Sequence, residues 1–411
     1  MMKHLLILFF CVLTLVGVKA QKSLDYFINQ AITNSPLLKD YKNQVLSFSL
    51  DSQIIRASLK PQVNGISNNS YAPIIGGYGY DEAITNGQQL SALLQVSKSF
   101  LSNKSIASQV ASLQIQSQAI TNSIKISEQD VIKSITDQYV IAYGEQLQLA
   151  FNNEVNELLR REDSLLKKLT QDNVFKQNEY LAFVVTLQQQ LLNSSQLEVQ
   201  YRFDYAGLNY LAGVVDTTIE RLEDPQLNPK AFGDYTTSVF YQQFVLDSLK
   251  LANDRMLVDL NYRPKITAYA DAGYNSSLVY KPYKNFGTSI GLSLSIPIRD
   301  GGQRKLQYSK IDIQSRTREY KRDFFMQQRN QQVFQLMQQL RSTEKLIDQV
   351  NKQVKYTETL ITVNEKLLAT GDIRLIDFIY SLNNYFNAKN LVTQNYISRL
   401  KIISQLNYWN R

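Results

Sequence analysis

Carboxylates are the residues of this chain whose type and spacing best suit them to chemistry. Asp372 and Asp377 stand five residues apart, and such a pair could in principle supply the acid and the base of a catalytic reaction. On long helices, however, most carboxylates are solvated charges. Neither a glycine-rich phosphate loop nor a cluster of metal ligands accompanies these two. We therefore expect no enzymatic activity, no metal site and no cofactor.

The chain's one histidine, His4, and its one cysteine, Cys11, lie in a segment typical of a secretory signal peptide. Residues 1–20 combine a basic start, an apolar run and a small-residue exit, which predicts a mature chain beginning near Gln21. Cys11 lies inside the apolar run without a lipoprotein cleavage site before it, so we expect no lipid anchor. Removing the segment would leave neither residue type, which excludes disulfides, zinc sites, cysteine nucleophiles and histidine-based triads.

The positive charge of the chain is spread along its length. The full sequence carries a net charge of +8, and loss of Lys3 and Lys19 with the leader would leave 42 basic residues against 36 acidic ones, or +6. This distribution is typical of solvated helix faces. We expect no nucleic-acid partner.

Scarce glycine and proline predict long uninterrupted helices. The 411 residues include 16 Gly and 8 Pro, and residues 74–224 and 298–411 contain no proline. Within 103–169 apolar residues recur at spacings of three, four or seven, a coiled-coil rhythm, and 303–369 behaves in the same way. Each helix would be ~100 Å long, which exceeds the size of an ordinary compact domain.

The two halves of the chain resemble each other, which predicts a duplicated fold. Pro61 and Pro264 lie in similar segments 203 positions apart, and the spacing from Asn173 to Glu179 recurs from Gly371 to Asp377, 198 positions later. Each half is expected to contain a helix, a strand, a loop, a strand, a long helix, a turn and a helix. The expected repeats are residues 21–212 and 238–411, joined by a linker at 213–237. In each, a first helix (24–59 or 238–262) and a return helix together match the length of the long helix.

Alternation of apolar with small or polar residues predicts strand hairpins within 60–102 and 263–300. The clearest run alternates Ile290, Leu292, Leu294, Ile296 and Ile298 with Gly291, Ser293, Ser295 and Pro297. Segments of about ten such residues are typical of transmembrane barrels, although a half-buried soluble sheet shares the pattern. Tyrosines gather in or beside the expected loops, as they do at membrane interfaces: Tyr71, Tyr78, Tyr80, Tyr274, Tyr280 and Tyr283. Four strands cannot close a barrel and open edges do not occur in lipid, so a membrane-spanning sheet would require several copies of the chain.

In these features the chain resembles the TolC family of bacterial outer-membrane efflux ducts over essentially its whole mature length. The residues that carry the resemblance are Pro61 and Pro264 between helix and strand, Gly301 and Gly302 between strand and helix, and the turn at 370–377. The resemblance implies a mainly α fold with transmembrane β strands, built from a duplicated helix-strand-strand-helix-helix unit. In a homotrimer, residues 103–212 and 303–409 would form a long α-helical barrel that continues a shared 12-stranded β-barrel. The linker at 213–237 would add an equatorial segment to this barrel.

The same resemblance implies a location and partners. The chain would lie in the outer membrane, in contact with its lipid, with a periplasmic extension. It would dock with a periplasmic adaptor protein and an inner-membrane transporter in a tripartite efflux or type I secretion system. Export of small molecules or proteins through it would be passive. The alternative hypothesis is an exported coiled-coil scaffold or surface protein without channel activity, which leaves the two matching hairpins unexplained.

The helical tips of the family form a closed periplasmic entrance, and the resemblance assigns gate candidates to this chain. Asp377 matches the family's gate aspartate, and Glu179 is its counterpart in the first half. The family pattern is altered at Tyr380, which replaces a second acidic residue, and at Arg374, one position later than the family's tip arginine. The alternative is that Asp377 is a solvated residue near a helix N-terminus, where negative charge is favourable.

Two residues are expected to end the long helices at these tips. Asn173 and Gly371 suit left-handed C-terminal caps, which would place the tips at about 170–178 and 369–376.

Overall fold

The computed structural model describes residues 22–410 apart from positions 232 and 280. The expected signal peptide at 1–20, with His4 and Cys11, lies outside the described residues. The chain divides into two compact units, and each draws on both halves of the sequence. Unit 1 contains residues up to Lys39, Lys125–Val239 and residues from Phe325 onward; unit 2 contains Asp40–Ile124 and Phe240–Phe324.

Two very long helices confirm the prediction from scarce glycine and proline. Helix α5 (Asn103–Gln171) has 69 residues and α8 (Gln303–Thr370) has 68. Both contribute residues to both units. Each long helix is followed by a return helix, α6 (Gln177–Ala212) or α9 (Leu375–Trp409). The first residues of these two helices are 198 positions apart, which matches the offset between the halves of the sequence.

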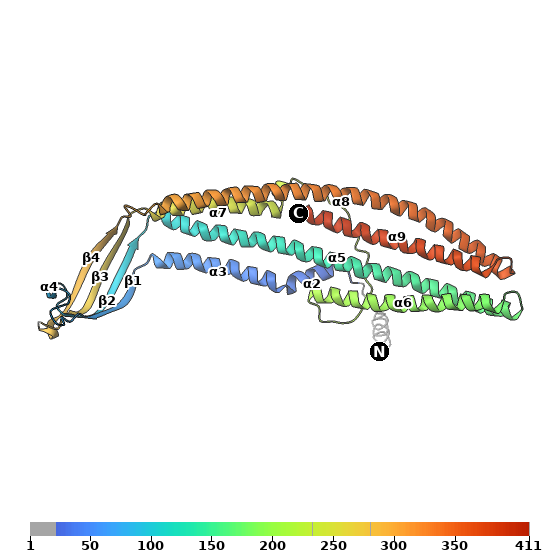
Figure 1. The fold of residues 1–411 in the computed structure, drawn as a ribbon, viewed down its shortest axis with the longest axis horizontal. Coiled ribbons are helices and arrows are strands. Elements are labelled where there is room, and N and C mark those ends of the chain that lie inside the picture. The colour runs from blue at the N-terminus through green and yellow to red at the C-terminus, as the bar shows by residue number, and fades with distance from the viewer. Residues whose placement is uncertain (1–21, 232, 280, 411) are drawn as a thin grey trace, which may run out of the picture. The chain divides into compact units, whose positions relative to one another are not determined.

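Unit 2 contains one four-stranded antiparallel sheet in the order β1-β2-β3-β4 (Figure 1). Its strands are β1 (Gln62–Tyr71), β2 (Gln88–Phe100), β3 (Lys265–Ser276) and β4 (Phe286–Ser295). The loops hold the short helices α4 (Glu82–Thr85) and η2 (Pro282–Lys284). The two expected hairpins are therefore joined by pairing of β2 with β3, for instance Val96 opposite Ala270.

The register gives this sheet one apolar and one polar face. Directly opposed residues of antiparallel strands point to the same face. Val96, Ala270 and Ile290 are aligned across three strands, and so are Leu94 and Ala272. Gln95, Asp271 and Ser289 are aligned on the other face. The apolar side chains are exposed: Ile290 is 88% accessible, Leu292 76% and Leu294 61%.

The last strand of the second hairpin is shorter in the structure than the sequence predicted. Strand β4 ends at Ser295, so Ile296 and Ile298 lie outside it, and the prediction that they continue the strand is wrong. Pro297 between them has no N–H to donate to a ladder, which accounts for the early end. Within the strand, Gly291 lies opposite Tyr269, whose ring occupies the space that a Cβ at position 291 would need.

Helices α3 (Pro36–Ser58) and α7 (Val239–Asn261), each of 23 residues, precede β1 and β3. Both end before the prolines expected to separate helix from strand, Pro61 and Pro264. The prediction of one helix over 24–59 is wrong, because α2 (Leu24–Asn34) ends before Pro36, which begins α3. Proline is favourable in the first turn of a helix. Further along it interrupts the helix, because it has no N–H to donate to the carbonyl one turn before it.

Polar contacts join the helices of unit 2 beside the sheet. Ser108 of α5 donates a hydrogen bond to Asn253 of α7 at 2.9 Å. Gly301 and Gly302 have φ values of 63° and 88°, and they turn the chain from β4 into α8, confirming the expected swing. Asp300 fixes that turn because its carboxylate accepts hydrogen bonds from the N–H groups of Gly302 at 2.9 Å and Arg304 at 2.7 Å.

Unit 1 consists of helices packed around apolar cores. Helix α6 lies along the later part of α5, and α9 lies along the later part of α8 (Figure 1). Phe151 of α5 contacts Tyr385 of α9 with a ring separation of 5.8 Å, so the two hairpins also touch. A second core, around α2, includes Phe27, Tyr139 and Tyr205, all with no exposed surface.

The expected linker at 213–237 is packed against helices of unit 1 and ends in the short helix η1 (Tyr235–Thr237). Leu222 is buried, and Lys22 forms an isolated parallel bridge with it. The Tyr139 hydroxyl of α5 donates a hydrogen bond to the Glu223 carbonyl at 2.7 Å. Asn407 of α9 donates one to the Asn228 carbonyl at 2.9 Å. The segment therefore holds α5 and α9 to one another within unit 1.

Candidate functional site

The first helical tip, between α5 and α6, is fixed by backbone hydrogen bonds. Asn173 has a φ of 62°, as the predicted left-handed cap requires, and the N–H of Val174 donates to the Leu169 carbonyl at 2.9 Å. Glu179 reaches back from the first turn of α6, where its carboxylate accepts a hydrogen bond from the Lys176 N–H at 3.0 Å. This is half of a capping box, so Glu179 has a local structural role.

The second tip, between α8 and α9, has the same design with different side chains. Gly371 has a φ of 74°, and the N–H of Asp372 donates to the Leu367 carbonyl at 2.9 Å. The Thr370 hydroxyl donates to the Asp372 carboxylate at 2.6 Å. Asp372 is therefore bound within the turn, and the structure gives it no contact with Asp377 among the hydrogen bonds of this tip.

Two of the predicted gate residues pair with each other. Arg374, just before α9, donates from Nε and Nη2 to the two carboxylate oxygens of Asp377 at 2.8 and 2.9 Å. The hydrogen bond and the charge of Asp377 raise the pKa of Arg374. Tyr380, one turn further on, is 68% exposed. The structure thus joins Arg374 to Asp377 and gives Glu179 a separate, backbone partner.

The two tips are in direct contact. A Cβ at Gly371 would lie 2.7 Å from a methyl carbon of Val174, so only glycine allows this approach. Below the tips, one apolar core joins all four helical segments, and its members include Leu166, Phe183, Leu368 and Phe378, none with exposed surface. Both hairpin ends are therefore positioned by one core.

The sequence did not predict a pair of carboxylates, on α5 and α8, that lies near the tips. Glu162 of α5 has one buried carboxylate oxygen, Oε2, without a hydrogen-bond partner among the described residues. Burial raises the pKa of Glu162, and the carboxylate of Glu365 on α8 raises it further, against the opposing effect of Arg161. Glu162 and Glu365 are 203 positions apart, the same offset as Pro61 and Pro264, but matching positions in two halves of a sequence need not be in contact. Their interaction depends on the approach of α5 to α8 in unit 1.

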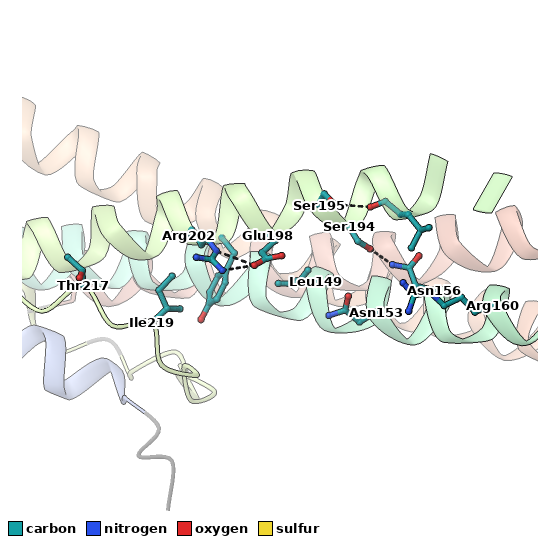
Figure 2. A pocket seen from close by; sticks show the side chains of 12 residues that line it. Leu149, Asn153, Asn156, Arg160, Ser194, Ser195, Glu198, Arg202, Thr217 and Ile219 are labelled. Carbon is teal, nitrogen blue, oxygen red and sulfur yellow. Dashed lines mark hydrogen bonds and ion pairs between the residues drawn. The ribbon is translucent and has the colours of Figure 1, made fainter. Parts of the chain in front are cut away.

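A polar groove of about 760 Å³ lies between α5, α6 and residues 217–219 of unit 1 (Figure 2). Arg202 on its wall is paired with Glu198 at 2.7 Å. Asn156 donates a hydrogen bond to the Ser194 hydroxyl at 2.6 Å, which holds α5 to α6. Burial raises the pKa of Tyr201, also on its wall, to about 12. The Asn156–Ser194 contact and the hydrogen bond from the Tyr201 hydroxyl to Gln146 join α5 to α6, whereas the Arg202–Glu198 pair lies within α6.

Among residues 22–410 outside positions 232 and 280, no three His, Cys, Asp or Glu side chains gather closely enough to hold a metal ion. Within the same residues, no helix has the length and apolar character needed to cross a membrane.

Comparison with solved structures confirms the predicted resemblance at the level of the fold. No protein-family model matches the chain, and no curated protein matches it. The outer membrane protein VceC from Vibrio cholerae matches with a TM-score of 0.73 at 11% identity, covering 94% of this chain and 96% of that one. A membrane protein from Pseudomonas aeruginosa matches with a TM-score of 0.74 at 13% identity, covering 94% and 89%. The open state of the Neisseria gonorrhoeae MtrE outer membrane channel matches with a TM-score of 0.70 at 12% identity, covering 94% and 88%.

Proposed function

We propose that this chain forms the outer-membrane duct of an export system, as a homotrimer with a periplasmic extension. Three copies of the four-stranded sheet would supply 12 strands to one shared barrel. Small molecules or proteins would pass through it without chemical change. Its partners would be a periplasmic adaptor protein and an inner-membrane transporter. The fold shared with outer-membrane channels supports this proposal.

The observation that carries the proposal is the exposed apolar face of the sheet. Ile290, Leu292 and Leu294 project from one face without cover, whereas Asp271 and Ser289 lie on the other. A soluble sheet would bury the apolar face, but a barrel in lipid exposes it and keeps the polar face toward water. Single exposed apolar residues are common on soluble proteins, but a continuous exposed apolar surface across three strands is not.

The free strand edges support a shared barrel. Strands β1 and β4 are the edges of the sheet, and each is ten residues long. Unpaired backbone groups are costly in lipid, so an edge in a membrane needs a partner strand. We propose that β1 of one copy pairs with β4 of the next, which would close the ring.

The helical tips would form the periplasmic entrance. The contact of Gly371 with Val174 and the common core below it would keep the two hairpins of one chain together. Arg374, Asp377 and Tyr380 would then line or flank the opening, with Glu179 shaping the other tip. This assignment follows the resemblance, and its geometric support is the exposed Arg374–Asp377 pair.

The proposal is tested by extracting the mature protein from outer-membrane fractions and determining the mass of the purified complex. The full chain has a mass of 47.2 kDa before leader removal. We expect a species that requires detergent and has about three times the mature mass, with ion conductance in planar bilayers. A water-soluble monomer or rod-like dimer would contradict the proposal and favour an exported coiled-coil scaffold.

A further inference from the structure

The two ends of the sheet in unit 2 carry different side chains. Strands β1 and β3 begin at the same end at which β2 and β4 finish, since Gln62 pairs with Ser97 and Lys265 with Ser295. Basic residues surround this end, and we call five of them the basic collar: Lys60, Lys98, Lys104, Arg263 and Arg299. The loops at the opposite end are aromatic, with Tyr78 86% exposed and Tyr80 and Tyr283 each 75% exposed.

The charges of the basic collar are not neutralised within the chain. All five side chains are exposed, and none forms an ion pair with any residue that the structure describes. The nearby acidic residues have other partners. Asp300 accepts two backbone N–H groups, and Asp259 is bound by Arg304 at 2.5 Å and by the Tyr308 hydroxyl. Five cations are therefore left facing solvent at one end of the sheet.

The basic collar meets the edge of the exposed apolar face. Lys98 belongs to that face, because it pairs with Ala268, which in turn pairs with Leu292. Its ammonium nitrogen lies 5.5 Å from the ring centroid of Phe100, also exposed, at the end of the same strand. The adjacent apolar residues Ile266 and Leu294 are exposed as well. An apolar surface bounded by cations matches a bilayer leaflet, in which the apolar acyl chains are bounded by negatively charged phosphates.

We propose that the basic collar binds the anionic phospholipid headgroups of the membrane leaflet on the helix side of the sheet, and so sets the depth and direction of insertion. This inference rests on the proposed membrane function and adds a lipid class to it. Charge complementarity favours anionic headgroups over zwitterionic ones, because each basic residue near an anionic surface contributes separately to binding. The loops at the other end also contain two exposed lysines, Lys281 and Lys284, but these are fewer than the five basic residues of the collar.

The test uses the full mature chain, purified in detergent and mixed with vesicles during detergent removal. One set of vesicles is phosphatidylcholine, and the other contains about one third phosphatidylglycerol. The initial rate of incorporation is measured by flotation, at low salt and at about 1 M salt, where the Debye length falls to about 3 Å. We expect incorporation into the anionic vesicles to be at least about tenfold faster at low salt, and the difference to disappear at high salt.

Matched variants assign the effect to the basic collar. The collar variant carries Lys60→Gln, Lys98→Gln, Lys104→Gln, Arg263→Gln and Arg299→Gln, and we expect it to lose the preference. The control variant removes the same charge from exposed helical positions of unit 1, by Gln at Lys167, Lys168, Lys352, Lys355 and Lys366, and should keep it. A third variant with Lys60→Arg, Lys98→Arg and Lys104→Arg keeps the charge and should also keep the preference, even if the collar variant fails to assemble.

Four results would overturn the inference. Retention of the preference by a collar variant that assembles would show that these five residues do not carry it. Equal rates for the unchanged protein in the two vesicle types would show that it has no anionic preference, while leaving the membrane function intact. A control variant that loses as much preference as the collar variant would assign the effect to net charge. Failure of the unchanged protein to enter either vesicle type would overturn the proposed function, and the lipid inference with it.

Discussion

Arg374 and Asp377 form a bidentate ion pair in which Nε lies 2.8 Å from Oδ2 and Nη2 lies 2.9 Å from Oδ1. The two residues are three positions apart at the start of α9, so the pair forms within one chain. Their side chains are 76% and 45% exposed. If Asp377 lines an entrance, Arg374 of the same chain therefore weakens the preference for cations that its carboxylate would give.

This pairing predicts opposite effects for its two members on ion selectivity. Arg374→Gln should increase the preference of the channel for cations over anions, because it frees the Asp377 carboxylate. Asp377→Asn should decrease that preference. We expect each change to be about twofold or more, measured as reversal potentials in planar bilayers. Asp372→Asn is the control, because Asp372 is held by Thr370. Unchanged potentials for both members in assembled channels would remove them from the gate.

The orientation of the sheet predicts different outcomes for arginine on its two faces. Ile290→Arg places a charge near the middle of β4 on the proposed lipid face, at a cost of ~2–4 kcal/mol per chain. Ser289→Arg, on the opposite face, should be accepted. The yield of folded protein in the outer-membrane fraction measures the difference. Equal yields for the two variants would contradict the orientation.

The free edges predict a cross-link between neighbouring copies. The mature chain is expected to lack cysteine, so thiols can be introduced without background. Asn64→Cys on β1 and Ser293→Cys on β4 both lie on the polar face. Oxidation of the double variant should give covalent dimers and trimers on denaturing gels, because paired strands bring Cα atoms to about 5.5 Å. Neither single variant should do so, and monomers from the double variant would argue against this pairing.

The close approach of the tips predicts a selective effect of a methyl group. Gly371→Ala adds a Cβ against Val174 at a positive φ, which costs roughly 1–2 kcal/mol for a residue other than glycine, before the steric conflict. We expect faster amide hydrogen exchange around residues 366–378. Asn173→Gly, at the matching left-handed position, relieves strain and should leave exchange unchanged or slower. Similar protection in both variants would contradict a rigid tip contact.

The partly buried carboxylate of Glu162 near the tips predicts a pH-dependent stability. The folded-state pKa of Glu162 is raised above the ordinary 4.5, so its ionised form destabilises the fold. The stability contribution of the protonated form is present below pH 4.5 and is lost as the pH rises through the folded pKa. Glu162→Gln should therefore raise the midpoint of thermal unfolding by about 1–4 °C at pH 8 and leave it unchanged in acid. The exposed control Glu157→Gln should have no such pH dependence, and an equal gain at every pH would contradict this explanation.

Features encoded locally were predicted from the sequence. Long helices follow from stretches without proline, and the caps at Asn173 and Gly371 follow from residue types that adopt positive φ. The alternation in β4 gave the apolar face directly. The break at Pro36 had an equally local signal, because proline has no N–H to donate, but the prediction of one helix over 24–59 did not use it.

Contacts between distant segments were not predictable from one sequence. Pairing of β2 with β3 joins residues more than 150 positions apart, and alternation alone does not choose a strand's neighbours. Glu162 and Glu365 are likewise brought together by the approach of α5 and α8. At the candidate site, the residue types at 374 and 377 were recognised, but their mutual ion pair depends on the side-chain geometry at the first turn of α9.

The packing of α2 has a consequence for the order of folding. Residues of α2 share their core with Tyr139, Tyr205 and Leu222, so α2 cannot complete its packing until nearly 200 further residues are present. The Tyr408 hydroxyl, which binds Asp130 at 2.7 Å, is 278 residues from its partner. Such distant pairings make slow folding and transient apolar exposure inherent to this topology. The apolar residues of α2 therefore stay uncovered until the distant segments that pack on them have been made.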